Sequence, residues 1–186
     1  MSAPASFRKR LTFDERQGEW RDGDARYLMI RHDSLMGMFN LLPTAARQTA
    51  LAAFAESVAT YGHRSVEKYR TQAIAPDLLL QMTADTAAQL GWGRWRFERT
   101  GDDEIRLDVL NSPFAAGHGP AQEMVCAAIA GMLCALSGLV FGKPAAAEEF
   151  SCAAAGGDLC RFVAHPCVHE TKQIPTSAHD PSGVAP

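Results

Sequence analysis

The sequence predicts an α+β domain in which an antiparallel sheet packs against helices, a fold class supported by three observations. Two segments that alternate apolar and charged residues flank a turn at Gly101–Asp103, which is typical of a β-hairpin. Apolar residues recur at helical spacing before this hairpin and form a long run after it. A second hairpin is predicted near the C-terminus, across the turn at Gly156–Asp158.

The composition indicates one folded domain. The chain has 186 residues, of which 47% are hydrophobic, so it can bury a core without disulfide bonds. Its net charge of −3 offers no basic surface, and we expect no nucleic-acid partner. The longest apolar run, residues 124–141, is short for a membrane span and rich in small residues. We therefore expect a buried helix there and no membrane span.

The N-terminus lacks the apolar segment of a signal peptide, which predicts a cytoplasmic location. In that compartment the five cysteines should be reduced, and this favours metal ligation over disulfide bonds. Residues 1–10 and 167–186 are expected to be disordered, the tail because it is rich in Pro, Ser, Ala and Gly. Residues 11–166 then form a single domain, with an N-terminal hairpin and helices in 11–90 and a core in 91–166.

Each element of this domain follows from a local pattern. A two-stranded ribbon is predicted within residues 11–30, ending in the apolar run Tyr27–Ile30. Breakers and caps then divide the chain into helices at 35–42, 45–61, 63–70 and 76–90. The later segments are predicted as strands at 92–99 and 105–110, a helix at 121–141, and strands at 146–152 and 159–164.

Four residues in the second half have the side chains of a structural zinc site. Three thiolates and one carboxylate are suitable zinc ligands, and four protein ligands complete a tetrahedron. Cys152 and Cys160 fall on the two arms of the predicted C-terminal hairpin, with Glu149 just before them and Cys126 in the preceding helix. From the spacing alone, a set of ordinary buried cysteines explains the pattern equally well.

The register of Glu149 and Cys152 requires an irregular strand. Residues three apart face opposite ways on a regular strand, so a bulge near Ser151 is needed if both are ligands. Glu148, at an even spacing from Cys152, is the alternative carboxylate ligand.

Beyond these ligands, residues 111–163 resemble the 4-vinyl reductase domain family. The shared pattern comprises Asn111–Phe114, Cys126, Gly131, Gly142–Lys143, Glu149-x2-Cys152 and Gly157-Asp158-x-Cys160-Arg161-Phe162. The segments Arg26–Arg31 and Gly62–Ser65 are similar to the region that precedes this pattern in such proteins. The resemblance therefore covers most of residues 20–165.

This resemblance, to a single-domain bacterial member of the family, implies an α+β fold shared with nitric-oxide-signalling and Golgi-transport proteins. It also implies a zinc site of three Cys and one Glu beside an apolar pocket. Family members include sensor domains of phenol-responsive activators, hydrocarbon-binding proteins and a protein linked to bacteriochlorophyll vinyl reduction. Phenol sensors place a His and a Trp in the pocket, where this chain has Leu79 and Leu110, so phenol itself is disfavoured as the ligand.

The function we expect is zinc-stabilised binding of a small apolar or amphipathic molecule, as a sensor, a carrier or an accessory protein. His118, in a loop between glycines, is the candidate gate of the ligand pocket. The pocket is expected between the long helix and the sheet, lined by Leu79, Met82, Trp95, Leu110, Phe114, His118 and Met132.

Enzymatic activity is less favoured, and no catalytic residues are predicted, because the sequence has no recognisable flavin or nicotinamide motif. The alternatives are a bacteriochlorophyll-type 4-vinyl reductase or its accessory subunit, and a structural adaptor that docks a protein partner.

A homodimer formed through the N-terminal part is the expected assembly. Residues 11–42 contain more large apolar side chains than a short hairpin and a short helix can bury. Strand edges and apolar surface of this kind favour pairing with a second copy. The alternative is that the ribbon extends the sheet of its own domain.

Overall fold

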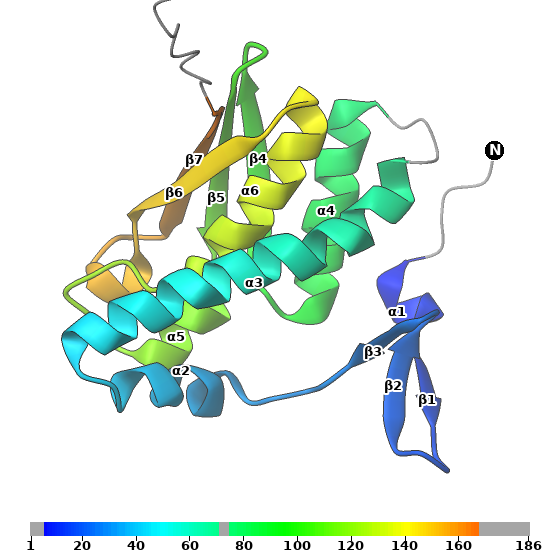
Figure 1. The fold of residues 1–186 in the computed structure, drawn as a ribbon, viewed down its shortest axis with the longest axis horizontal. Coiled ribbons are helices and arrows are strands. Elements are labelled where there is room, and N and C mark those ends of the chain that lie inside the picture. Colours follow the sequence, from blue (N-terminus) through cyan, green and yellow to red (C-terminus); the bar gives the residue numbers. More distant parts are fainter. Residues whose placement is uncertain (1–5, 71–74, 168–186) are drawn as a thin grey trace, which may run out of the picture.

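The computed structural model describes residues 6–70 and 75–167, and for residues 63–70 it describes the backbone alone. A four-stranded antiparallel sheet is covered on one face by helices, and a small three-stranded sheet lies beside this body (Figure 1). This mixed architecture confirms the predicted fold class. No helix of the described residues is long and apolar enough to cross a membrane.

The main sheet consists of the two predicted hairpins. Its strands lie in the order β4 (Arg94–Thr100), β5 (Glu104–Leu110), β7 (Cys160–Pro166) and β6 (Ala145–Ser151), and all neighbours are antiparallel. The alternation predicted from sequence places one face of β5 in the core, where Ile105, Leu107 and Val109 are fully buried. The sheet thus presents one apolar face to the helices.

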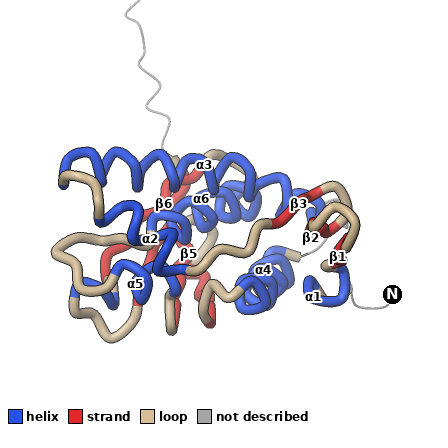
Figure 2. Tube along the Cα trace, turned by 90° about the horizontal axis from the view of Figure 1, so that it is seen from below, coloured by secondary structure: helices blue, strands red, loops and turns tan. Residues whose placement is uncertain are grey.

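Two helix layers cover that face. Helix α6 (Ala127–Phe141) lies on β6 and β7, and α4 (Pro76–Leu90) lies on β4. Helix α3 (Thr44–Arg70) crosses the outer side of α6, as the view from below also shows (Figure 2). Since α6 contacts both the sheet and α3, its residues are apolar around most of the helix.

Helix α3 does not end at Gly62, as the sequence suggested, but continues to Arg70. Helical glycine often marks an end, yet here it allows a close contact between helices. A Cβ atom at Gly62 would lie 2.7 Å from Cε of Met132 on α6. The glycine is therefore required by packing rather than by a helix stop.

The predicted helix at 121–141 is also wrong at its start. The region contains a separate short helix, α5 (Pro113–His118), and then a loop that ends at Cys126, the N-cap residue of α6. The Ser112 hydroxyl caps α5 by accepting a hydrogen bond from the Ala115 backbone N–H at 3.4 Å. Shorter elements complete the body, namely α2 (His32–Asn40) and the 3-10 helix η1 (Ala153–Ala155).

The N-terminal segment forms its own sheet instead of extending the main one. The sheet has three short strands, β1 (Thr12–Asp14), β2 (Glu19–Asp22) and β3 (Ala25–Tyr27), where we expected two longer ones. The expected disorder of residues 1–10 is wrong for α1 (Phe7–Arg10). Phe7 is buried with its ring edge-on to Tyr27, which fixes this short helix on the small sheet. Residues 1–5 and 168–186 lie outside the described residues.

The predicted last strand of the ribbon is instead an exposed linker. Leu28, Met29 and Ile30 follow β3, make no strand, and have 84%, 66% and 54% of their surface exposed. Figure 1 shows this linker crossing from the small sheet to α2. Three consecutive exposed apolar residues form a surface patch that the described chain leaves uncovered.

Candidate metal centre

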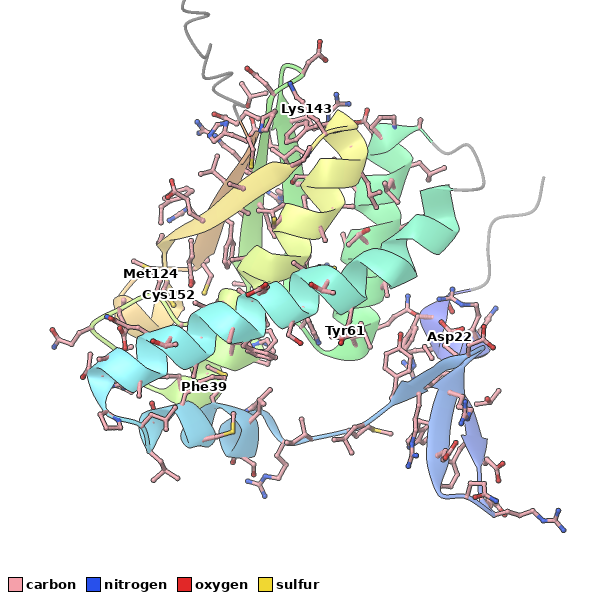
Figure 3. All side chains as sticks on the ribbon, in the orientation of Figure 1. Asp22, Phe39, Tyr61, Met124, Lys143 and Cys152 are labelled. Carbon is pink, nitrogen blue, oxygen red and sulfur yellow. The ribbon has the colours of Figure 1, made fainter. Side chains whose placement is uncertain are left out.

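Four side chains from three separate segments meet at one end of the main sheet. Cys126 lies at the start of α6, Glu149 on β6, Cys152 just after β6, and Cys160 at the start of β7. One ligand atom from each residue lies within 4.8 Å of the others. Cys152 sits beside the loop that contains Met124 and leads to α6 (Figure 3). The structure thus gathers the four residues selected from the sequence into a group that could hold a metal ion.

The distances among the sulfur atoms match tetrahedral coordination. Sγ of Cys126 lies 3.9 Å from Sγ of Cys152 and 3.6 Å from Sγ of Cys160, and the last two sulfurs are 4.0 Å apart. A tetrahedron with metal–sulfur bonds of about 2.3 Å has edges of about 3.8 Å. All three cysteines are buried, so a cation there would be shielded from water on the sulfur side.

A bulge in β6 allows Glu149 to join the cysteines. The pairing register shifts between Glu149 and Ser151, opposite Phe162 and Arg161 of β7. This is the irregularity that the sequence required, and it turns Glu149 and Cys152 to the same side. Glu148 is exposed on the other face of the strand, away from the cluster.

The carboxylate of Glu149 is positioned with one oxygen free. Its Oε2 accepts a hydrogen bond from the Cys126 backbone N–H at 2.8 Å. Its Oε1 is buried and has no hydrogen-bond partner among the described residues. A buried carboxylate oxygen without a partner is costly, and a bound cation would satisfy it.

The electrostatics of the cluster also call for a cation. Burial, reinforced by the Cys152 thiol, raises the pKa of Glu149 to about 8. Hydrogen bonds from the Cys126 and Cys160 thiols hold the pKa of Cys152 well below its usual range. The hydrogen bond to Cys152 also raises the pKa of Cys126. Without a metal the cluster can therefore carry little negative charge, whereas a divalent cation would stabilise all four ligands in their ionised forms.

Backbone groups around the sulfurs support the same arrangement. The Ala153 N–H points to Sγ of Cys160 at 3.4 Å, and the Ser112 hydroxyl lies 3.2 Å from Sγ of Cys126. Such contacts orient metal ligands and tune their charge. The turn after Cys152 is closed by Gly157, where a Cβ atom would lie 2.6 Å from Oγ of Ser151. The sequence pattern of a Gly–Gly turn beside cysteines thus reflects steric requirements.

The residues predicted to line a ligand pocket are scattered in the structure. Leu79 and Phe114 are buried in the core, and Met132 packs against Gly62. Leu110 is 55% exposed, which corrects its assignment to the pocket, because the core face of β5 belongs to its odd-numbered neighbours. Met82 on α4 is half-buried.

The other two predicted lining residues face two separate hollows. Trp95 lines a groove of about 370 Å³ between α4 and β4. His118 lines a polar hollow of about 480 Å³ at the start of α3, with Arg47 and Glu123 among its neighbours. His118 is buried, and its Nε2 has no hydrogen-bond partner among the described residues.

Sequence reasoning missed a continuous chain of aromatic contacts through the core. Neighbouring rings lie 5.1–6.3 Å apart between centroids. The series runs from α2 through α3 and α5 to β4, in the order Phe39, Phe54, Phe114, Trp92, Trp95 and Phe97. These residues come from four separate segments, so no single stretch of sequence reveals their contact.

Comparison with protein families and solved structures places this architecture. The profile of the vinyl-4-reductase domain family matches residues 105–166, which include every residue of the cysteine–glutamate cluster. The chain carries a vinyl-4-reductase domain. No curated protein sequence matches it significantly.

Solved structures extend this likeness beyond the segment that the family profile matches. The phenol-responsive sensory domain of the transcription activator PoxR, solved with phenol, superposes with a TM-score of 0.73 at 20% identity, covering 86% of each chain. Two weaker similarities were found. A trafficking protein particle complex subunit 3 from Naegleria fowleri, covalently bound to palmitic acid, has a TM-score of 0.49 at 12% identity, covering 72% of this chain and 93% of that one. A vinyl-4-reductase family protein from Methanocaldococcus jannaschii has a TM-score of 0.47 at 13% identity, covering 76% and 98%. The likeness to the PoxR domain shows that the N-terminal helices and the vinyl-4-reductase domain together form one known fold.

Proposed function

We propose that this chain is a zinc-stabilised domain that binds a small apolar or amphipathic molecule, as a sensor, a carrier or an accessory protein. The observation that carries the proposal is the superposition of 86% of the chain on a domain that responds to phenol. The aromatic chain from Phe39 to Phe97 supports it, because apolar and aromatic side chains predominate in small-ligand sites.

Ligand binding to the folded state should raise the melting temperature of the protein. We expect a shift of several degrees with at least one small aromatic compound at saturating concentration, because binding adds RT ln(1 + [L]/Kd) to the free energy of unfolding. Differential scanning fluorimetry with phenol, cresols and aromatic acids measures this. If no compound shifts the melting temperature, the adaptor function is favoured over ligand binding.

Zinc is the metal we propose for the cluster of Cys126, Glu149, Cys152 and Cys160. Three thiolates and one carboxylate match the softness and the coordination number of Zn²⁺, and a site with four protein ligands is structural. Closed coordination leaves no position for substrate, so the proposed role of the metal is to join α6 to the C-terminal hairpin.

The two adjacent glutamates provide a matched test of this site. Glu149→Gln should lower zinc affinity by about 10–100-fold, since it removes the charge of one ligand, whereas Glu148→Gln should leave affinity unchanged. Competition with a chromophoric chelator gives both values. Equal affinities in the two variants would exclude Glu149 as a ligand.

We further propose that two copies assemble through the N-terminal part. Support comes from the exposed linker Leu28–Ile30 and from the small sheet, whose outer strands have free edges. Closed two-fold association is the commonest way to cover such a surface.

Removal of this segment should change the oligomeric state. Deleting residues 1–31 is expected to convert a dimer into a monomer, and the point variant Met29→Asp should weaken the dimer because it places a charge in the apolar linker. Light scattering across a concentration series measures both effects. A full-length chain that is monomeric at high micromolar concentration would contradict the proposal.

A further inference from the structure

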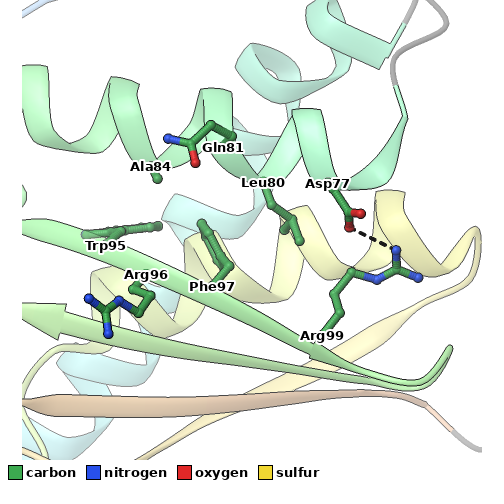
Figure 4. Close-up of a pocket in the computed structure, with 8 residues that line it drawn as sticks. All are labelled: Asp77, Leu80, Gln81, Ala84, Trp95, Arg96, Phe97 and Arg99. Atoms are coloured by element: carbon green, nitrogen blue, oxygen red, sulfur yellow. Dashed lines mark hydrogen bonds and ion pairs between the residues drawn. The ribbon is translucent and has the colours of Figure 1, made fainter.

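The groove between α4 and β4 has the size and shape of a small-ligand site. Its volume is about 370 Å³, within the range of such sites. Because β4 is an edge strand of the main sheet, the groove opens to the side of the molecule. Its lining residues are Asp77, Leu80, Gln81, Ala84, Trp95, Arg96, Phe97 and Arg99 (Figure 4).

Aromatic rings and aliphatic side chains form the apolar part of the groove. The rings of Trp95 and Phe97 lie 5.9 Å apart at an interplanar angle of 70°, and Leu80 and Ala84 of α4 face them. The indole N–H of Trp95 donates to the Trp92 carbonyl oxygen at 3.0 Å, so its polar atom is already satisfied. The surface that remains suits an aromatic ring, which can pack edge-to-face or offset against the other two.

A cation stands at one end of this apolar surface. Nη1 of Arg99 lies 3.1 Å from Oδ1 of Asp77, which spans the groove from the first turn of α4. The Asp77 side chain is 82% exposed, while that of Arg99 is 27% exposed. Ion pairs with such an exposed partner contribute little, so the Asp77 carboxylate can be displaced at small cost. Asp77 therefore occupies a position that a ligand carboxylate could take.

Arg99 also has unused donors. Its Nε is buried and has no hydrogen-bond partner among the described residues, and its Nη2 reaches only the exposed Asp102 at 3.8 Å. A guanidinium binds a carboxylate best through two parallel N–H donors. The present pairing with Asp77 does not use that capacity.

From this arrangement we propose that the α4–β4 groove binds a small aromatic carboxylate. The ring packs on Trp95 and Phe97, and the carboxylate binds the Arg99 guanidinium in place of Asp77. The proposal rests on the small-molecule-binding function proposed above and deepens it by naming the ligand class and the residue that selects it.

The test compares phenylacetate with its neutral isostere phenylacetamide, using isothermal titration calorimetry on the full chain. Phenylacetate should bind the wild type about tenfold more tightly, because only the carboxylate makes charge-assisted hydrogen bonds to Arg99. Arg99→Gln should remove this preference. Arg94→Gln is the matched control, since Arg94 is exposed on the same strand and does not line the groove, and it should retain the preference.

A second variant tests the proposal at an exposed position that folding does not depend on. Asp77→Asn removes the internal competitor and should increase phenylacetate affinity about two- to threefold, with phenylacetamide unaffected. An unchanged affinity in this variant, or a preference for the acid that survives Arg99→Gln, would overturn the proposal. Equal binding of acid and amide to the wild type would overturn the ligand class while supporting the proposed function. Binding of neither compound would overturn the groove site, and the melting-temperature screen with phenols then decides the proposed function separately.

Discussion

Replacing Cys160 with serine is expected to reduce bound zinc from about one ion per chain to a small fraction and to destabilise the fold strongly. A serine hydroxyl does not replace a thiolate as a zinc ligand, and the binding energy of a structural metal is folding energy. We expect the free energy of unfolding to fall by at least about 3 kcal/mol, which lowers the melting temperature by roughly 6–12 °C for a domain of this size. Elemental analysis and thermal unfolding measure the two effects.

The exposed Cys167 provides the control for this substitution. Cys167→Ser also removes one thiol, but it lies outside the cluster and should leave zinc content and melting temperature unchanged. A strong chelator separates metal loss from packing loss, since it should destabilise the wild type and have little effect on Cys160→Ser. Freshly purified wild-type protein without metal, or with a melting temperature insensitive to the chelator, would contradict the proposal.

The cluster could be selected from sequence because its signals are local or nearly so. A Gly–Gly turn between Cys152 and Cys160 predicts a hairpin, and a hairpin brings its two arms together whatever the rest of the fold does. The choice between Glu148 and Glu149 depends on one bulge, which alternation alone cannot place. The chemistry of the side chains thus suggested the group, and backbone geometry determined which carboxylate joins it.

The ligand surface could not be predicted in the same way. Arg99 and Asp77 are 22 positions apart and meet because α4 packs on β4. Similarity to the phenol sensors assigns Leu110 to the pocket, yet the alternation of β5 turns it outward. Sites built from side chains of different elements depend on packing, and packing is decided by the whole chain.

The second failure of local reasoning concerns glycines in helices, and it leads to a prediction of comparable size. The sequence places a helix end at Gly62, yet this residue lies inside α3 where Met132 of α6 approaches. Gly131, in the middle of α6, has the same role in a tighter form. A Cβ atom there would overlap the carbonyl oxygen of Ala55 on α3. Because that oxygen belongs to the backbone, it cannot move aside as a flexible side chain would.

Gly131→Ala is therefore expected to destabilise the protein by about 2–4 kcal/mol, although alanine is the better helix former by about 1 kcal/mol. The overlap forces α3 away from α6 and opens the contact between the two helix layers. Gly138→Ala in the same helix is the matched control, since its Cβ would lie an ordinary 3.6 Å from the Lys143 carbonyl oxygen. That variant should be neutral or slightly stabilised. Chemical denaturation of both variants measures the difference, and equal stabilities would show that α3 and α6 do not approach as closely as this structure has them.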